Sequence, residues 1–214
     1  MIEHTPIFVT GCRRSGLSMT SAILYLHGVW TGENKAQKIN KMSFKNKRLW
    51  DEGFLIFLTS SKKSLNFEKG FDELRIRSHI ESLLIHQGFR GGYWLLKNHS
   101  LIEHQDTITK IFPKAVWIHV RRSADEILKS CLKTFPLGLR KSEEEWRQII
   151  SETIRRMDSF SNRELVYTVH PEKFFNNDFS EIENVICQGL KLDWMGGAVK
   201  ELFKRANRGK SNNS

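Results

Sequence analysis

The residues between positions 11 and 18 have the composition of an anion-binding loop. Gly11 and Gly16 allow a tight turn in which several backbone N–H groups point at one place. Arg14 adds a full positive charge, and the hydroxyls of Ser15 and Ser18 add hydrogen-bond donors. Together these groups favour binding of a phosphate or a similar anion. The whole loop, the candidate nucleotide-binding segment, reads Gly11, Cys12, Arg13, Arg14, Ser15, Gly16, Leu17 and Ser18.

A strand and a helix must flank such a loop, and the neighbouring sequence predicts both. The run Pro6–Thr10 is short, apolar and β-branched, as is typical of a buried strand. A helix is predicted from Ser15 to Leu26, before Gly28, and its N-terminus adds partial positive charge at the loop. We therefore expect a phosphorylated nucleotide as ligand. The simpler alternative is a tight strand-to-helix turn with two surface arginines.

The loop differs from two better-known phosphate loops. A Walker A loop has Lys directly before Ser or Thr, and Leu17 stands there instead, before Ser18. The missing lysine argues against a P-loop nucleoside or nucleotide kinase, which stays an alternative. Cys12 suggests a phosphatase-like thiolate nucleophile. Its spacing to the arginines does not match a phosphatase loop, however.

A second cationic site follows another predicted strand, at residues 115–120. Arg121 and Arg122 leave the carboxyl end of this strand, and Ser130 lies about two turns into the next helix. An amphipathic helix preceded by two arginines is the simpler interpretation.

Strands and helices alternate along the chain, which predicts an α/β fold with a central parallel sheet between two helical layers, α/β/α. We expect one domain over residues 1–214, with an insertion on the acceptor side at 35–74 and a frayed tail at 208–214. The predicted strands are 6–10, 93–96, 115–120 and 165–169. The predicted helices are 15–26, 101–111, 123–134, 142–160 with a capping box at Ser142, 179–190 and 195–206.

The loop from Gly11 to Ser18 resembles the 5′-phosphosulfate loop of sulfotransferases that use 3′-phosphoadenosine 5′-phosphosulfate (PAPS). The usual form of that loop is Gly-x-Pro-Arg/Lys-Ser-Gly-Thr-Ser/Thr. Arg13 stands where Pro is common, and Leu17 stands where Thr is common and removes a hydroxyl. The chain looks most like the compact bacterial or viral members, and the resemblance implies a fold like that of P-loop nucleoside-triphosphate hydrolases.

Two further segments carry the same resemblance. Arg122 and Ser130 have the spacing of the family's 3′-phosphate motif, with Ser123-Ala124 in place of Asp-Pro. The resemblance implies that Arg122 and Ser130 reach one phosphate, with Arg121 as the alternative if the register shifts by one residue. The segment Trp94–His99 resembles the family strand that ends in Lys-x-His or Lys-Asp-Pro. Lys97 is then expected at the carboxyl end of a strand, where ligands gather in open α/β sheets. The resemblance therefore covers most of the chain.

The resemblance implies transfer of a sulfuryl group from PAPS to a hydroxyl or amine of a small-molecule or carbohydrate acceptor, with 3′-phosphoadenosine 5′-phosphate (PAP) as product and no metal. Arg14 and Lys97 are the candidate cations for the transition state. His99 and Glu33 are rival candidates for the base that takes the acceptor proton. His99 has an ordinary pKa near neutrality, whereas Glu33 would need burial or a strong contact.

The composition limits the remaining classes of function. A formal net charge of +10 fits a strongly anionic ligand, and leaves a non-catalytic basic module for nucleotides or polyanions as a further alternative. We expect no nucleic-acid partner. No apolar run approaches the roughly 18 residues of a membrane span. Cys12, Cys131 and Cys187 are far apart and odd in number, which argues against disulfides and zinc and favours the cytoplasm.

Overall fold

The strand that leads into the loop lies in the middle of a parallel sheet. The computed structural model of the chain describes residues 4–31, 73–134 and 141–211. Its sheet has the order β2-β1-β3-β4, and all neighbouring pairs are parallel. The carboxyl ends of the strands therefore meet at one edge. The strands are β1 (His4–Gly11), β2 (Gly92–Lys97), β3 (Val116–Val120) and β4 (Val166–Val169).

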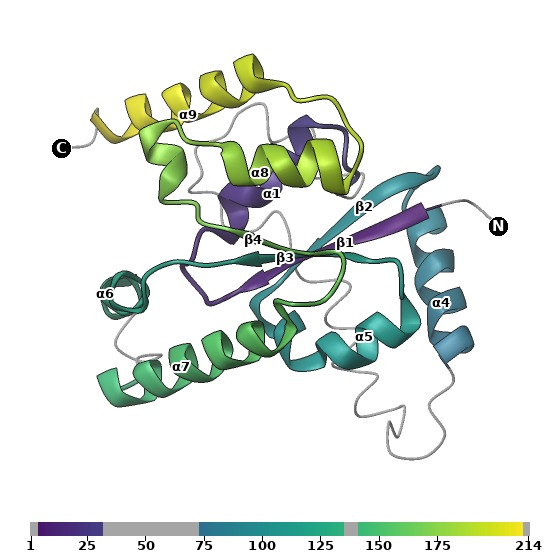
Figure 1. Cartoon of the computed structure of the whole chain (residues 1–214), viewed down its shortest axis with the longest axis horizontal. Helices are drawn as coiled ribbons and strands as arrows, with labels where there is room; N and C mark the ends of the chain where they lie inside the picture. The colour runs from purple at the N-terminus through teal and green to yellow at the C-terminus, as the bar shows by residue number, and fades with distance from the viewer. Residues whose placement is uncertain (1–3, 32–72, 135–140, 212–214) are drawn as a thin grey trace.

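Helices cover both faces of this sheet, as Figure 1 shows. One face carries α1 (Leu17–Leu26), α8 (Ser180–Asn184), the π-helical turn η4 (Val185–Gly189) and α9 (Gly196–Ser211). The other face carries α4 (Glu73–His86), the 3-10 helix η1 (His99–His104), α5 (Gln105–Ile111) and α7 (Glu143–Phe160). Helix α6 (Ala124–Thr134) packs against α7, and η3 (Lys173–Asn176) follows β4. The predicted α/β/α arrangement with a parallel sheet is confirmed.

The central strand explains why the sheet needs helices on both sides. Side chains alternate between the two faces of a strand. Ile7 and Val9 pack into the cluster formed with α1, α8 and α9, whereas Phe8 packs among residues of α4 and α5. All three are fully buried. The continuous apolar run in the sequence is thus the pattern of a strand covered on both faces.

The four predicted strands are present, with ends that differ by at most two residues. The predicted capping box of α7 is also confirmed: Ser142 Oγ accepts from the Glu145 N–H at 3.1 Å, and the Glu145 carboxylate accepts from the Ser142 N–H at 2.6 Å. None of the helices in the three described segments is long and apolar enough to cross a membrane.

Four helical regions differ from the prediction. The region 101–111 begins earlier, at His99, as the 3-10 helix η1, because Asn98 Oδ1 accepts from the Ser100 N–H at 2.8 Å and turns the chain directly after β2. The region 179–190 is divided between α8 and η4. Helix α4 was not predicted, and α9 continues through residues 208–211 of the expected tail. Glu33 and residues 35–72 of the expected insertion lie outside the described residues.

Strand β1 ends at Gly11, where its backbone passes very close to β3. Gly11 pairs in register with Val120. An ideal Cβ placed on Gly11 would lie 2.3 Å from the carbonyl oxygen of Val120, which is far inside van der Waals contact. A side chain at this position would therefore force the end of β1 away from β3.

We expect Gly11→Ala to lower the free energy of unfolding by about 2 kcal/mol, or roughly 4–8 °C in Tm, because the new methyl overlaps backbone that cannot move freely. Thermal and urea unfolding measure this. Gly197→Ala is the matched control, since Gly197 lies in α9 with nothing within 4 Å of its ideal Cβ. It should be neutral or stabilising by up to about 1 kcal/mol. Equal effects of the two substitutions would contradict the close approach.

Candidate functional site

The loop between β1 and α1 is a tight turn held by its own backbone. The Ser15 N–H donates to the Cys12 carbonyl at 3.2 Å. Arg14 has a φ of 68° and Gly16, the N-cap of α1, a φ of 108°, so both lie in the left-handed region. At Gly16 an added Cβ would also lie 2.8 Å from Pro171. The turn delivers the chain to the start of α1, whose first N–H groups have no acceptor within the helix.

Ser15 places a buried hydroxyl in the loop that an anion would satisfy. Its side chain is almost completely buried, and its hydroxyl oxygen has no hydrogen-bond partner within the described part of the chain. The Ser15 hydroxyl oxygen lies 3.2 Å from an ideal Cβ on Gly11, which places it beside the last residue of β1. A buried hydroxyl without a partner is costly. A phosphate or sulfonate oxygen in the loop would accept its hydrogen bond.

The two predicted nucleotide motifs meet in space. The Nε atom of Arg14 donates to Ser130 Oγ at 3.0 Å, and Nη1 of Arg122 donates to the Arg14 carbonyl at 3.2 Å. Arg122 also pairs with Glu126 at 2.7 Å. Arg121 points elsewhere and pairs with an α7 carboxylate, at 2.6 Å. Of the two arginines after β3, Arg122 therefore contacts the loop, through the residue that also contacts Ser130.

The other side of the loop faces the end of β2 and the start of η1. Lys97 is largely buried, and its Nζ donates to Ser18 Oγ at 3.5 Å. The Nε atom of Arg13 donates to His99 Nε2 at 2.9 Å. Thr10, at the end of β1, donates from its hydroxyl to the His99 carbonyl at 3.4 Å. The structure thus brings Lys97 and His99 to the loop, with Arg13 as the arginine next to His99.

Burial and the charges around His99 keep its ring neutral. Burial, and then the positive charges of Arg13 and Lys97, lower the pKa of His99 from its ordinary 6.5 to about 4. At neutral pH the ring therefore carries one proton and one lone pair. This protonation state is the one that a general base requires.

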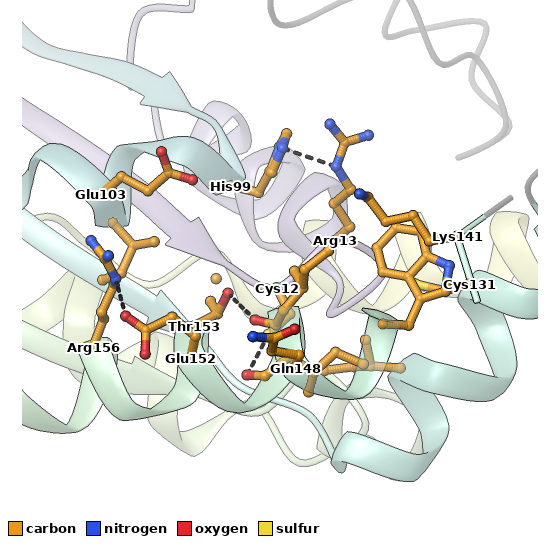
Figure 2. A pocket seen from close by; sticks show the side chains of 16 residues that line it. Cys12, Arg13, His99, Glu103, Cys131, Lys141, Gln148, Glu152, Thr153 and Arg156 are labelled. Atoms are coloured by element: carbon orange, nitrogen blue, oxygen red, sulfur yellow. Dashed lines mark hydrogen bonds and ion pairs between the residues drawn. The ribbon is translucent and has the colours of Figure 1, made fainter. Parts of the chain in front are cut away.

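A pocket of about 590 Å³ opens beside His99 and extends to α7. In Figure 2, Arg13 and His99 lie on one side of it and the labelled side chains of α7 lie on the other. Its floor is apolar and buried, and its rim is polar. The floor includes Ile127, Cys131, Trp146 and Ile150. The rim includes Glu103, Lys141, Gln148, Glu152, Thr153 and Arg156.

The sequence did not predict this pocket. Its α7 residues carry no motif, although Trp146, Ile150 and Thr153 follow the helical spacing of three and four residues. That spacing predicts one buried face of a helix. It does not say that the face borders the loop after β1.

Cys12 is unsuited to nucleophilic chemistry here. Its side chain is buried, and its thiol lies 3.9 Å from the Ile150 carbonyl as a weak donor. Burial raises the pKa of the Cys12 thiol to about 11. The thiolate would be scarce at neutral pH, so the phosphatase-like alternative finds no support. Within the described residues, no three His, Cys, Asp or Glu side chains gather in a group that could hold a metal ion.

The predicted residues of the loop and of the two later motifs surround one edge of the sheet. Two residues of the loop make contacts that the sequence did not predict. Arg14, predicted as a catalytic cation, contacts Ser130, while Arg13 contacts His99. Leu17, at the position where Thr is common, packs against the hydrophobic cluster of α1, α8 and α9. The side chain that replaces the hydroxyl thus contributes to the core instead.

Among solved structures, the sulfotransferase STF1 from Mycobacterium tuberculosis H37Rv shares the fold with a TM-score of 0.54 and 13% identity, over 95% of this chain and 77% of that one. No curated protein matches the chain. The model of the sulfotransferase family matches residues 6–195, most of the sequence. On that match, the chain belongs to the sulfotransferase family.

Proposed function

We propose that the protein transfers a sulfuryl group from PAPS to a hydroxyl or amine of an acceptor. The donor carries two anionic ends, a 5′-phosphosulfate and a 3′-phosphate, and needs two cationic sites at a fixed separation. The loop from Gly11 to Ser18 supplies the first site, with Ser15 Oγ buried and without a partner in the described segments. Arg122 and Ser130 supply the second.

The observation that carries this proposal is the contact between the two sites. Arg14 reaches Ser130 across 116 positions of sequence, at 3.0 Å, and Arg122 reaches the Arg14 carbonyl across 108 positions, at 3.2 Å. A generic nucleotide loop would need only the first site. A second arginine and a hydroxyl next to it favour a nucleotide with an additional phosphate, because an Arg guanidinium pairs well with phosphate oxygens.

The site is also suited to the transfer step. The acceptor oxygen or nitrogen forms a bond to sulfur, and the bond between sulfur and the bridging phosphate oxygen breaks. The bonding electrons leave with PAP. His99 Nε2 takes the acceptor proton, while Lys97 and Arg13 are placed to stabilise negative charge on the sulfonate and the leaving oxygen. By analogy with phosphoryl transfer, positioning and charge supply most of the catalysis.

The pocket beside His99 is the proposed acceptor site. Because His99 and Arg13 line it, an acceptor bound there would meet the base and the loop together. Its apolar floor suits the body of a small molecule or the face of a sugar ring, and its polar rim suits hydroxyl groups. We expect a small-molecule or carbohydrate acceptor.

We expect PAP to raise the Tm of the protein more than ADP or AMP does, because a ligand that binds the native state stabilises it. Arg122→Ala should weaken PAP binding at least about tenfold, since it removes a charge-assisted hydrogen bond of about 1.5–3 kcal/mol. Isothermal titration calorimetry measures the dissociation constant. Arg163→Ala is the matched control, because Arg163 pairs with Asp106 at 3.2 Å and lies outside both motifs.

The alternatives give different results in the same assay. A nucleoside or nucleotide kinase would respond to ATP with magnesium as strongly as to PAP. A basic module for polyanions would bind polymers with a steep salt dependence and show no preference for a 3′-phosphate. Absence of any response to PAP, or PAP binding that survives both Arg14→Ala and Arg122→Ala, would contradict the proposed site.

We expect His99→Asn to lower the turnover of PAPS about 10²–10⁴-fold while the affinity for PAP stays within about twofold, because the substitution removes a base and leaves the phosphate contacts. The release of PAP from PAPS in the presence of trial phenols, alcohols and sugars measures turnover. Glu33→Gln is the matched test of the rival base. If only that variant loses turnover, Glu33 is the base and His99 is not.

A further inference from the structure

Arg13 and Arg14, adjacent in the loop, contact residues on two different sides of it. Arg14, with its left-handed φ of 68°, contacts Ser130 on α6. Arg13 contacts His99 at the start of η1, and both residues line the pocket (Figure 2). The proposed nucleotide site uses Arg14 and the 3′-phosphate motif. The transfer step gives Arg13 a charge to place near the sulfonate, but no reason for its guanidinium to hold a histidine.

The contact has a definite arrangement of protons. An arginine Nε always carries hydrogen in proteins and can only donate, so His99 Nε2 must accept at 2.9 Å. The ring is then the neutral form with its proton on Nδ1. Ser100 Oγ lies 3.3 Å from the same Nε2 atom. The one lone pair with which His99 could take a proton is therefore already engaged.

Charged groups reach this histidine from several elements. Arg13 comes from the loop and Lys97 from the end of β2. After burial, which is the largest cause, these two charges further lower the pKa of His99. Glu103 on η1 lines the same pocket. Across the pocket, Glu152 and Arg156 of α7 pair with each other at 2.7 Å. The charges that act on His99 in this state are thus predominantly positive, and an anion entering the loop would compete with the ring for Arg13.

We propose that Arg13 is a positioning residue that holds His99 Nε2 until an anionic donor draws the guanidinium away, so that His99 becomes available as a base only when the donor is bound. The inference rests on the proposed function. The exchange needs no further group: Arg13 trades a neutral nitrogen acceptor for a phosphosulfate oxygen, a stronger partner because it is charged. Removal of the acceptor proton would then follow donor binding.

The test is the pKa of the His99 ring, measured by NMR pH titration, with His99→Asn used to assign its signal among the eight histidines. In the unliganded protein, Arg13→Gln should raise this pKa by about 1 or more, because a nearby like charge is lost. Arg13→Lys, which keeps the charge, should restore most of the low value. Arg14→Gln is the matched control from the same loop and should leave the pKa near that of the native protein.

Addition of PAP distinguishes two effects on the pKa of His99: the release of Arg13 and the negative charge of the nucleotide itself. PAP should raise the pKa of His99 in both the native protein and Arg13→Gln, but by more in the native protein, because only there is a guanidinium withdrawn. Turnover gives a second measurement. The pH at which PAPS turnover is half-maximal should differ between low and saturating PAPS in the native enzyme. This difference should be smaller in Arg13→Gln.

Three results would overturn the inference or its basis, and they are distinguishable. An unchanged pKa of His99 in unliganded Arg13→Gln would show that Arg13 does not hold the ring. Equal rises with PAP in the two proteins would show that Arg13 is not released. Absence of any PAP binding, seen as unchanged amide signals of the loop and an unchanged Tm, would remove the proposed function and the release step with it.

Discussion

The approach of Gly11 to the carbonyl of Val120 is the constraint on which the site depends. It allows β1 to stay paired with β3 up to its last residue, so the loop begins at the sheet edge and not above it. From that point Arg14 reaches α6, the helix that follows β3, and Arg13 reaches η1, which follows β2. A wider separation of β1 from β3 would move the loop away from α6 and η1, and the loop and Arg122 would no longer share an edge of the sheet.

Positive charge gathers at this edge of the sheet. Four cationic side chains, Arg13, Arg14, Lys97 and Arg122, converge from three strand ends. Each donates to a neutral oxygen or nitrogen, and Arg122 also pairs with the Glu126 carboxylate. Such an arrangement favours a ligand with several negative charges. Membership of the sulfotransferase family and the depressed pKa of His99 are consistent with a donor that brings those charges.

Local patterns were enough to predict most of the elements around the site. Apolar runs predicted all four strands, and the sequence at Ser142 predicted its capping box. The helix from Glu73 to His86 was not predicted, because it has a weak amphipathic pattern and lies next to a basic, aperiodic segment. The motifs also predicted which residues gather at the edge. They assigned a catalytic cation to Arg14, whereas Arg13 is the arginine that contacts His99, which depends on the left-handed turn at Arg14. They also did not predict the pocket, which forms from long-range packing of α7.

The central claim is that the loop and the Arg122–Ser130 pair hold the two ends of one nucleotide, and a crystal structure of the protein with PAP tests it most directly. The account predicts the 5′-phosphate inside the loop, within hydrogen-bond distance of Ser15 Oγ and the first N–H groups of α1. It predicts the 3′-phosphate on Arg122 and Ser130, with Arg13 withdrawn from His99. A nucleotide bound away from the loop, or one whose 3′-phosphate faces solvent, would contradict the account.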